Sequence, residues 1–160
     1  DAYQDITIPF QMSSVEFFTM VKEHLNENGV MVVNMNMRGN NEGNINQYLS
    51  DTIASVFDHI VTVDVDGSTN RELYASSNAD MVKTLENNAN ETGHSDLRDM
   101  MLHVADTSSV YEAGDYIMTD DKAPVELLGM QVIDQLIQGE VAYYKDIFEK
   151  DGINGLLESL

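Results

Sequence analysis

The first 37 residues constrain the fold most, because they place an acidic loop, a helix and an apolar strand in that order. Asp1, Tyr3 and Asp5 form a short loop of the kind that follows a buried strand, and the apolar strand 30–37 comes after the helix. In open α/β sheets, ligands bind beyond the carboxyl ends of the strands. No Gly-rich phosphate or nucleoside loop follows further along the chain. We therefore expect the second half of such a sheet, in a piece of an enzyme that is inactive alone.

The first helix has clear boundary signals. Ser13 and Glu16 have the spacing of a capping box, and Gly29 is placed to end the segment in a left-handed conformation. One apolar stripe is formed by Phe17, Phe18, Val21 and Leu25. The strand 30–37 is apolar on both faces at its start, which is typical of a strand in the interior of a sheet, covered on both sides.

The remaining pattern predicts a helix over 45–57, a half-exposed strand over 59–66, a turn over 66–70 and a returning strand over 71–76. Helices are expected over 79–90 and 96–105, and another begins at Pro124, with an interruption at Gly139. We interpret residues 1–77 as half of an α/β domain and residues 78–160 as a helical extension that packs on it.

Charge limits the classes of partner. With 28 acidic and 8 basic side chains, the net charge of −20 disfavours binding to nucleic acid and to anionic lipid. Long-range steering of a cationic substrate such as a polyamine would suit this charge, although the charge could equally serve solubility. The absence of cysteine excludes disulfides and thiolate chemistry and fits a cytoplasmic location. No apolar run approaches the roughly 20 residues that span a bilayer, so we expect no membrane contact by this segment.

Several acidic residues are candidates for a site. Asp1 could hold a substrate amine or accept its proton, although a turn with ordinary solvated acids explains the same spacing. Asp120, Asp121 and Glu126 could line a cleft, but Asp120 or Asp121 is also placed to cap the helix that starts at Pro124. Glu126 lies in the first turn, where a negative charge is favourable. The four histidines share no ligand spacing, so no metal site is expected.

Five motifs together resemble the spermidine synthase family. They are Asp1-Ala2-Tyr3-Gln4-Asp5, Ile8-Pro9-Phe10, Ser14-x-Glu16-Phe17-Phe18, Leu25-x-x-x-Gly29-Val30-x-x-x-Asn34 and Asp120-Asp121-Lys122-Ala123-Pro124-Val125-Glu126. The resemblance covers most of 1–77 and again 118–137, whereas 78–117 matches no family motif. It implies a partial Rossmann-type sheet of the class I methyltransferase kind, with flanking helices and a helical C-terminal region.

The resemblance also implies a reaction, the transfer of an aminopropyl group from decarboxylated S-adenosylmethionine to an amine. Asp1 matches the acid that contacts and deprotonates the amine. The second family acid falls three residues later, where this chain has Gln4, and the next acid is Asp5. A family glutamine at the end of the next strand is replaced by Asn34 or Asn36. We expect Tyr3, Asp5, Asn34, Asn36 and Glu126 to contact substrate, and we expect no tightly bound cofactor.

Two other functions stay open at this point. The same fold could support a methyltransferase that uses S-adenosylmethionine, or a non-catalytic interaction module that has lost the chemistry. If upstream strands are missing, an uncovered apolar edge on strand 30–37 would invite pairing with another chain. We therefore expect a homodimer, a strand-exchanged assembly, or a missing N-terminal half.

Overall fold

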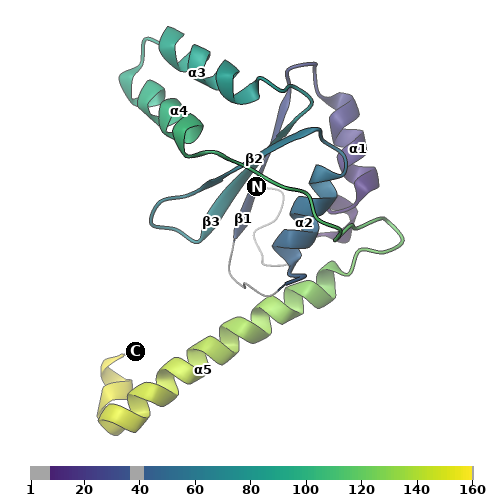
Figure 1. The fold of residues 1–160 in the computed structure, drawn as a ribbon. Coiled ribbons are helices and arrows are strands. Elements are labelled where there is room, and N and C mark those ends of the chain that lie inside the picture. Colours follow the sequence, from purple (N-terminus) through teal and green to yellow (C-terminus); the bar gives the residue numbers. More distant parts are fainter. Residues whose placement is uncertain (1–7, 37–41, 160) are drawn as a thin grey trace.

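The computed structural model describes residues 8–36 and 42–159, which form a small mixed α/β body with one long projecting helix (Figure 1). A short 3-10 helix, η1 (Phe10–Met12), precedes the first α-helix. The remaining elements are, in chain order, α1 (Val15–His24), β1 (Val30–Asn36), α2 (Ile45–Ala54), β2 (His59–Asp64), β3 (Asn70–Ser76), α3 (Met81–Glu91), α4 (Ser95–Thr107), β4 (Ser109–Val110) and α5 (Val125–Glu158).

The four described strands form one sheet in the order β1-β3-β2-β4. Each neighbouring pair is antiparallel, so β1 and β2 run parallel to each other with β3 between them. The hairpin from β2 to β3 is confirmed, and Gly67 in its turn has a φ of 68°, a conformation that glycine adopts without strain. The short strand β4 was not predicted, because two residues carry no readable alternation.

The prediction that strand β1 is covered on both sides is wrong. Among the described strands, β1 has β3 as a neighbour and lies at an edge of the sheet. Its residues alternate between the core and the outside, so Met35 is 3% exposed whereas Val32 is 52% exposed. The outward valines line a cavity instead of meeting a packed layer, so the apolar run does not mean that both faces of β1 are covered.

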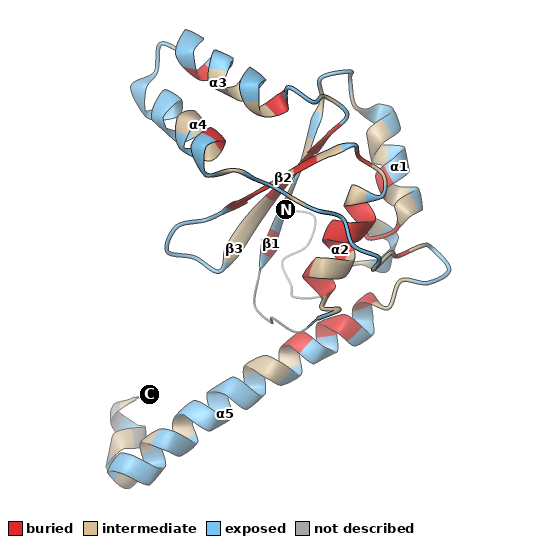
Figure 2. Ribbon diagram, in the orientation of Figure 1, coloured by how far each residue is buried: buried red, intermediate tan, exposed pale blue. Residues whose placement is uncertain are grey.

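Helices cover the two faces of the sheet unequally (Figure 2). On one face α1, α2 and the start of α5 enclose the core, while the α3–α4 hairpin lies over part of the other face. The core cluster comprises Phe18, Met35, Ile45, Leu49, Ile53, Phe57, Ile60, Leu73, Ala75, Met118, Val125, Leu128 and Val132. Burial of these apolar side chains supplies most of the stabilisation.

The start of α1 differs from the predicted capping box by one residue. Ser14, not Ser13, is the N-cap, and its hydroxyl oxygen accepts from the Phe17 backbone N–H at 3.2 Å. The same hydroxyl donates to the Asp120 carboxylate at 2.5 Å, and Glu16 accepts from the Asp120 backbone N–H at 3.0 Å. The carboxylate of Asp120 therefore bonds the N-cap residue of α1, and the expectation that it caps α5 is wrong.

We expect Ser14→Ala to lower the free energy of unfolding by about 1–2 kcal/mol, because a buried cap and its bond to Asp120 are lost together. Urea unfolding monitored by circular dichroism measures this change. Ser95→Ala, at the exposed start of α4, is the matched control and should change stability by less than about 0.5 kcal/mol. Equal effects of the two substitutions would contradict the role given to Ser14.

Two glycines behave differently from expectation. Gly139 does not interrupt α5, which continues to Glu158 with a break in its helical backbone at Gly152, where φ is 65°. Gly29 does not supply a left-handed stop, since the glycines with positive φ in the described residues are Gly43, Gly67 and Gly152. α1 instead ends at His24, with Leu25 extended after it.

Candidate functional site

The outward face of β1 changes from apolar to polar toward the carboxyl end of the strand. Val30 and Val32 line a cavity, and Asn34 and Asn36 continue the same face because side chains in a strand alternate with a period of two. Across the β1–β3 pair, Asn34 lies opposite Glu72 and Asn36 lies opposite Asn70. Directly opposite side chains in such a pair are about 5 Å apart at Cβ. A row of amide and carboxylate groups therefore spans β1 and β3 at this end of the sheet.

Glu72 gives this row its charge. It is half-buried, and burial raises the pKa of its carboxyl. The neighbouring Tyr74, on the same face of β3, has its pKa raised mainly by burial and further by the negative charge of Glu72. A carboxylate that is partly removed from water gains more from a nearby cation than an exposed one does. This face can therefore bind a positively charged amine.

Sequence reasoning did not single out Glu72. The alternation of buried Leu73 and Ala75 with Glu72 and Tyr74 was available in the sequence and places the acid on the side away from the core. Its pairing with Asn34 was not available, because the register of two strands 40 residues apart follows from the fold.

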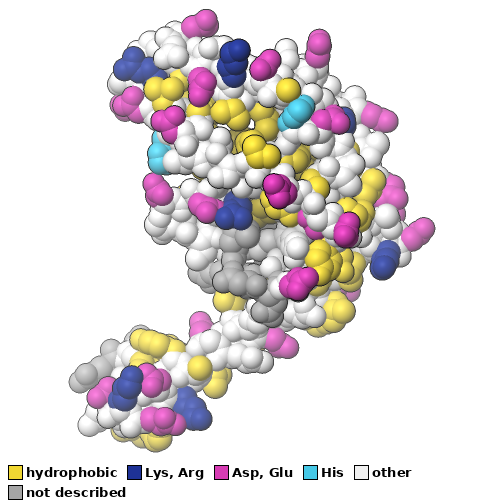
Figure 3. Space-filling model, viewed as in Figure 1, with side chains coloured by type: hydrophobic (Ala, Val, Ile, Leu, Met, Phe, Trp, Pro, Cys, Tyr) yellow, Lys and Arg dark blue, Asp and Glu magenta, His cyan; other side chains and the backbone are white. Residues whose placement is uncertain are grey.

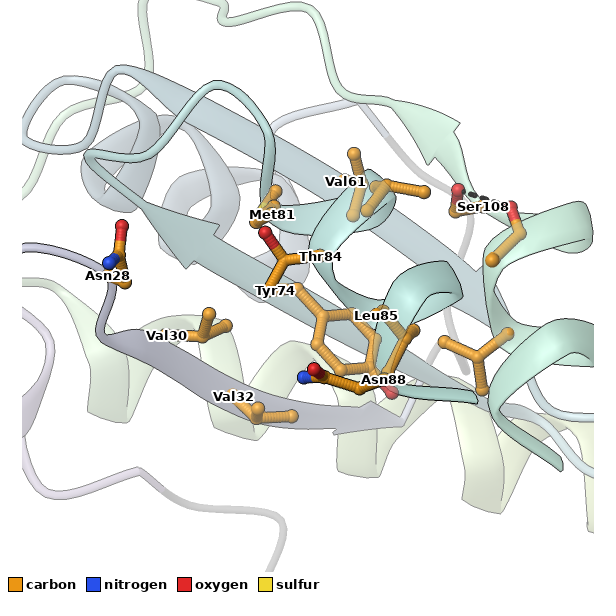
Figure 4. Close-up of a pocket in the computed structure, with 13 residues that line it drawn as sticks. Asn28, Val30, Val32, Val61, Tyr74, Met81, Thr84, Leu85, Asn88 and Ser108 are labelled. Atoms are coloured by element: carbon orange, nitrogen blue, oxygen red, sulfur yellow. Dashed lines mark hydrogen bonds between the residues drawn. The ribbon is translucent and has the colours of Figure 1, made fainter. Parts of the chain in front are cut away.

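A cavity of about 310 Å³ adjoins the polar row. It lies between the sheet and the α3–α4 hairpin, and its strand wall is formed by Val30, Val32, Val61 and Tyr74. Figure 4 shows the opposite wall, where Thr84, Leu85 and Asn88 of α3 approach the Tyr74 ring. The lining is mainly apolar and includes the polar residues Asn28, Thr84, Asn88 and Ser108, which suits a partly aliphatic molecule with a polar end.

The carboxyl end of β1 is tied to the start of α2. The Asn46 side chain donates to the backbone oxygen of Asn36 at 2.8 Å, and Thr69 donates to the Asn36 side-chain oxygen at 3.1 Å. Asn44 caps α2 by accepting from the Gln47 backbone N–H at 3.0 Å. These bonds hold the end of the strand in place, so the orientation of the polar row is set by the fold.

A buried carboxylate fastens the loop that follows β4. Asp51 on α2 is 1% exposed and accepts from the Tyr111 hydroxyl at 2.7 Å, the Gly114 backbone N–H at 2.9 Å and the Tyr116 backbone N–H at 3.1 Å. Burial, followed by the bond to Asp51, strongly raises the pKa of Tyr111, which therefore stays protonated. Three donors therefore converge on the Asp51 carboxylate, and we assign it a structural role in holding this loop.

Comparison with known proteins finds one similar protein. Over 177 aligned residues, the chain is 50% identical to a protein of Bifidobacterium longum (strain NCC 2705) described as a probable polyamine aminopropyl transferase. The alignment covers all of this chain and 40% of that protein. The chain is thus similar, over its whole length, to part of a spermidine synthase-like protein. No family model matches it, and no solved structure matches it significantly.

The similarity to this relative confirms the resemblance carried by the five motifs. It also extends to residues 78–117, which matched no motif, because the alignment includes the whole chain. The elements α3, α4 and β4 thus belong to the shared region. The chain spans less than half the length of this spermidine synthase-like relative.

Of the predicted site residues, the structure describes Asn34, Asn36 and Glu126. Asn34 and Asn36 lie on one face of β1, as expected for residues near a strand end. Glu126 is exposed in the first turn of α5. Asp1, Tyr3 and Asp5 lie outside the described residues.

Within 8–36 and 42–159, no group of three or more His, Asp or Glu side chains is arranged to hold a metal ion. No helix in this described part is both long and apolar enough to cross a bilayer.

Proposed function

We propose that this chain is the C-terminal part of an enzyme that transfers an aminopropyl group from decarboxylated S-adenosylmethionine to an amine. The observation that carries the proposal is the 50% identity, over the whole chain, to a probable polyamine aminopropyl transferase. In this reaction the neutral amine nitrogen attacks the propyl carbon bound to the sulfonium. The carbon–sulfur bond breaks, 5′-methylthioadenosine leaves, and the amine proton passes to a carboxylate.

The strand arrangement is compatible with a methyltransferase-type sheet. β1 and β2 run parallel with the antiparallel β3 between them, and the outer edge of β1 lies where a preceding parallel strand would pair. We assign residues 1–77 to that sheet and 78–160 to the extension, which also contributes β4. The nucleoside-binding half would then come from outside this chain.

We assign each candidate site residue a role from the chemistry of its side chain. Asp1 accepts the proton of the attacking amine, because an amine must be neutral to act as a nucleophile. Tyr3, Asp5, Asn34, Asn36 and Glu126 are assigned to substrate contact, and Glu72 joins them as the charge on the polar row. A sulfonium is already activated as an electrophile, so the chemistry requires neither a metal nor a tightly bound cofactor.

The charge of the chain supports a cationic acceptor. A net charge of −20 raises the local concentration of an amine that carries one or two positive charges. The space-filling view shows acidic side chains scattered over the displayed face, with few lysines and arginines among them (Figure 3). The cytoplasmic location and the exclusion of nucleic acid stay predictions.

The proposal is tested with the longer protein that contains this chain. Purified protein is incubated with decarboxylated S-adenosylmethionine and a set of amines, and 5′-methylthioadenosine release is measured by chromatography. Release that depends on a polyamine acceptor is the expected result. Formation of S-adenosylhomocysteine from S-adenosylmethionine would replace the proposal by a methyltransferase. No turnover with either donor, in a folded protein, would favour a non-catalytic interaction module.

Glu72→Gln in the same protein should raise KM for the amine about tenfold while kcat changes little. The substitution removes the charge and keeps the shape, and one charge-assisted contact contributes about 1.5 kcal/mol. Initial rates over a range of amine concentrations measure the effect. Glu91→Gln, the same change at the exposed end of α3, is the control and should leave KM unchanged. An unchanged KM for Glu72→Gln would remove Glu72 from the site.

A further inference from the structure

The α3–α4 hairpin leaves a cavity between itself and the sheet. Figure 4 shows side chains of α3 on one side of this space and side chains of β1 and β3 on the other. The volume of about 310 Å³ falls at the lower end of the roughly 300–1,000 Å³ that ligand pockets span. Packed layers of a protein leave few voids larger than a water molecule, so the packing of the core does not account for a space of this size.

The walls of this cavity carry no charge. None of the 13 lining residues, all within the described part of the chain, is acidic, basic or a histidine, although charged side chains make up 22% of the sequence. The acid of β3, Glu72, is two residues from Tyr74 and lies outside the lining. A charged group that enters such a space loses water without gaining a counter-charge. The lining therefore favours a neutral ligand over a protonated amine.

Three polar side chains in the walls have no hydrogen-bond partner within the described part of the chain. They are Tyr74 on β3, and Thr84 and Asn88 on α3. By contrast, the Ser108 hydroxyl donates to the backbone oxygen of Ala105 at 2.9 Å. In Figure 4 the Tyr74 ring extends from β3 toward α3, so open polar groups approach the cavity from both of its sides. Hydroxyl and amide groups supply donors as well as acceptors, and a ligand with one polar group can bond to them.

Apolar side chains provide most of the remaining lining. Val30 and Val32 of β1 stay accessible, at 40% and 52% exposed, and Leu85 lines the α3 side of the same space. Contact with a hydrocarbon chain would remove this apolar surface from water, which is favourable. A peptide segment suits the cavity less well, because it brings one donor and one acceptor for each residue and the open polar groups are few.

We propose that this cavity binds a small neutral molecule with an aliphatic body and one hydrogen-bonding group, such as an aliphatic alcohol or amide. The body contacts Val32 and Leu85, and the polar group bonds to Tyr74 and Asn88. The ligand differs in charge from the amine assigned to the polar row, where Glu72 favours a cation. Binding in the cavity requires no aminopropyl transfer, so it can be measured directly on the 160-residue chain.

Three probes with the same six carbons separate the effect of charge from that of shape: 1-hexanol, hexylamine and hexanoate. The chain is labelled with ¹³C at its valine and leucine methyl groups, and each probe is titrated at pH 7 while the methyl signals are recorded by NMR. The signals of Val32 and Leu85 should shift saturably with 1-hexanol. Protonated hexylamine and hexanoate should bind at least tenfold more weakly. Equal affinity of the three probes, or no saturable shift with 1-hexanol, would overturn the proposal.

Val32→Trp should weaken 1-hexanol binding at least tenfold, because the indole ring occupies the space that the ligand needs. Val65→Trp is the matched control, since Val65 is also exposed but does not line the cavity. Tyr74→Phe keeps the apolar wall and removes a hydroxyl, so the affinity should fall about two- to tenfold. Tyr48→Phe, on α2, is its control and should leave the affinity unchanged. Circular dichroism verifies that the variants stay folded, and equal effects within either pair would contradict the assigned contacts and overturn the proposal.

Two further measurements distinguish other occupants of the cavity. An excess of 1,4-diaminobutane should leave the 1-hexanol shifts unchanged, because both of its ends are charged. Displacement of 1-hexanol by the diamine would show that the acceptor amine extends into the cavity, and the proposal would fall. In the longer protein that contains this chain, 1-hexanol should bind with the same affinity. Loss of binding there, in a folded protein, would show that another segment fills the cavity and would equally overturn the proposal.

Discussion

Asp1→Asn, introduced into the longer protein, is expected to lower kcat/KM for aminopropyl transfer by about 10²–10⁴-fold. The asparagine keeps the size of the side chain and can still hydrogen-bond the amine, but it cannot accept the proton of the nucleophile. The loss should fall mainly on kcat, because the acid acts in the transition state. Measuring 5′-methylthioadenosine release over a range of amine concentrations separates the two constants.

Asp5, the next acid in the sequence, provides the comparison for this prediction. Asp5→Asn changes the same loop in the same way, but we assign Asp5 to binding, so KM should rise while kcat stays within a few fold. A pH profile adds a second readout, because removal of a general base should abolish the acidic limb of kcat/KM. If Asp1→Asn retained full activity with the parent pH profile, Asp1 would not be the base.

Asp51→Ala should lower the free energy of unfolding by about 3–5 kcal/mol, the largest stability effect that we expect from a single substitution. It leaves two backbone N–H groups and one hydroxyl without their acceptor, in a region where Asp51 itself is 1% exposed. At about 2–4 °C per kcal/mol, the melting temperature should fall by roughly 6–20 °C. Differential scanning calorimetry of the 160-residue chain measures the change.

Tyr111→Phe separates the contribution of one donor from that of the network. It removes the hydroxyl that donates to Asp51 at 2.7 Å and keeps both backbone donors, so the cost should be about 1–2 kcal/mol. Gly114→Ala should also destabilise, because the added Cβ would lie 2.6 Å from the Asp51 carboxylate oxygen. Equal stability of Asp51→Ala and Tyr111→Phe would show that the backbone bonds contribute little.

Local patterns predicted the elements more reliably than their surroundings. The order of helices and strands through Ser76 was readable because amphipathic spacing is a property of each segment. The environment of β1 was not readable, since its outward valines line a cavity under α3 and α4, which come some 50 residues later. The same limit applies to Ser14 and Asp120, which are 106 residues apart in sequence and bonded in the fold.

The candidate site could likewise be predicted only in part, where the signal was local in the sequence. Asn34 and Asn36 could be proposed from their place at a strand end, where chemistry is expected in α/β sheets. Glu72 could not be connected with them, because its position opposite Asn34 depends on the register of β1 and β3. The prediction that Asp120 caps α5 was wrong because the fold brings the start of α1 close to it. The Asp120 carboxylate bonds Ser14 at the start of α1 instead.

The place of β3 in the sheet has a consequence for how the chain folds during synthesis. β3 lies between β1 and β2 but follows both in sequence, so β1 has no described strand to pair with until residue 76 has left the ribosome. The β2–β3 hairpin closes over a short turn and should form first, because local contacts cost less loop entropy. Docking of β1 onto the finished hairpin then brings the three longer described strands together, and β4 adds to β2 later. Until that step, the apolar side chains of β1 stay accessible to water and to chaperones.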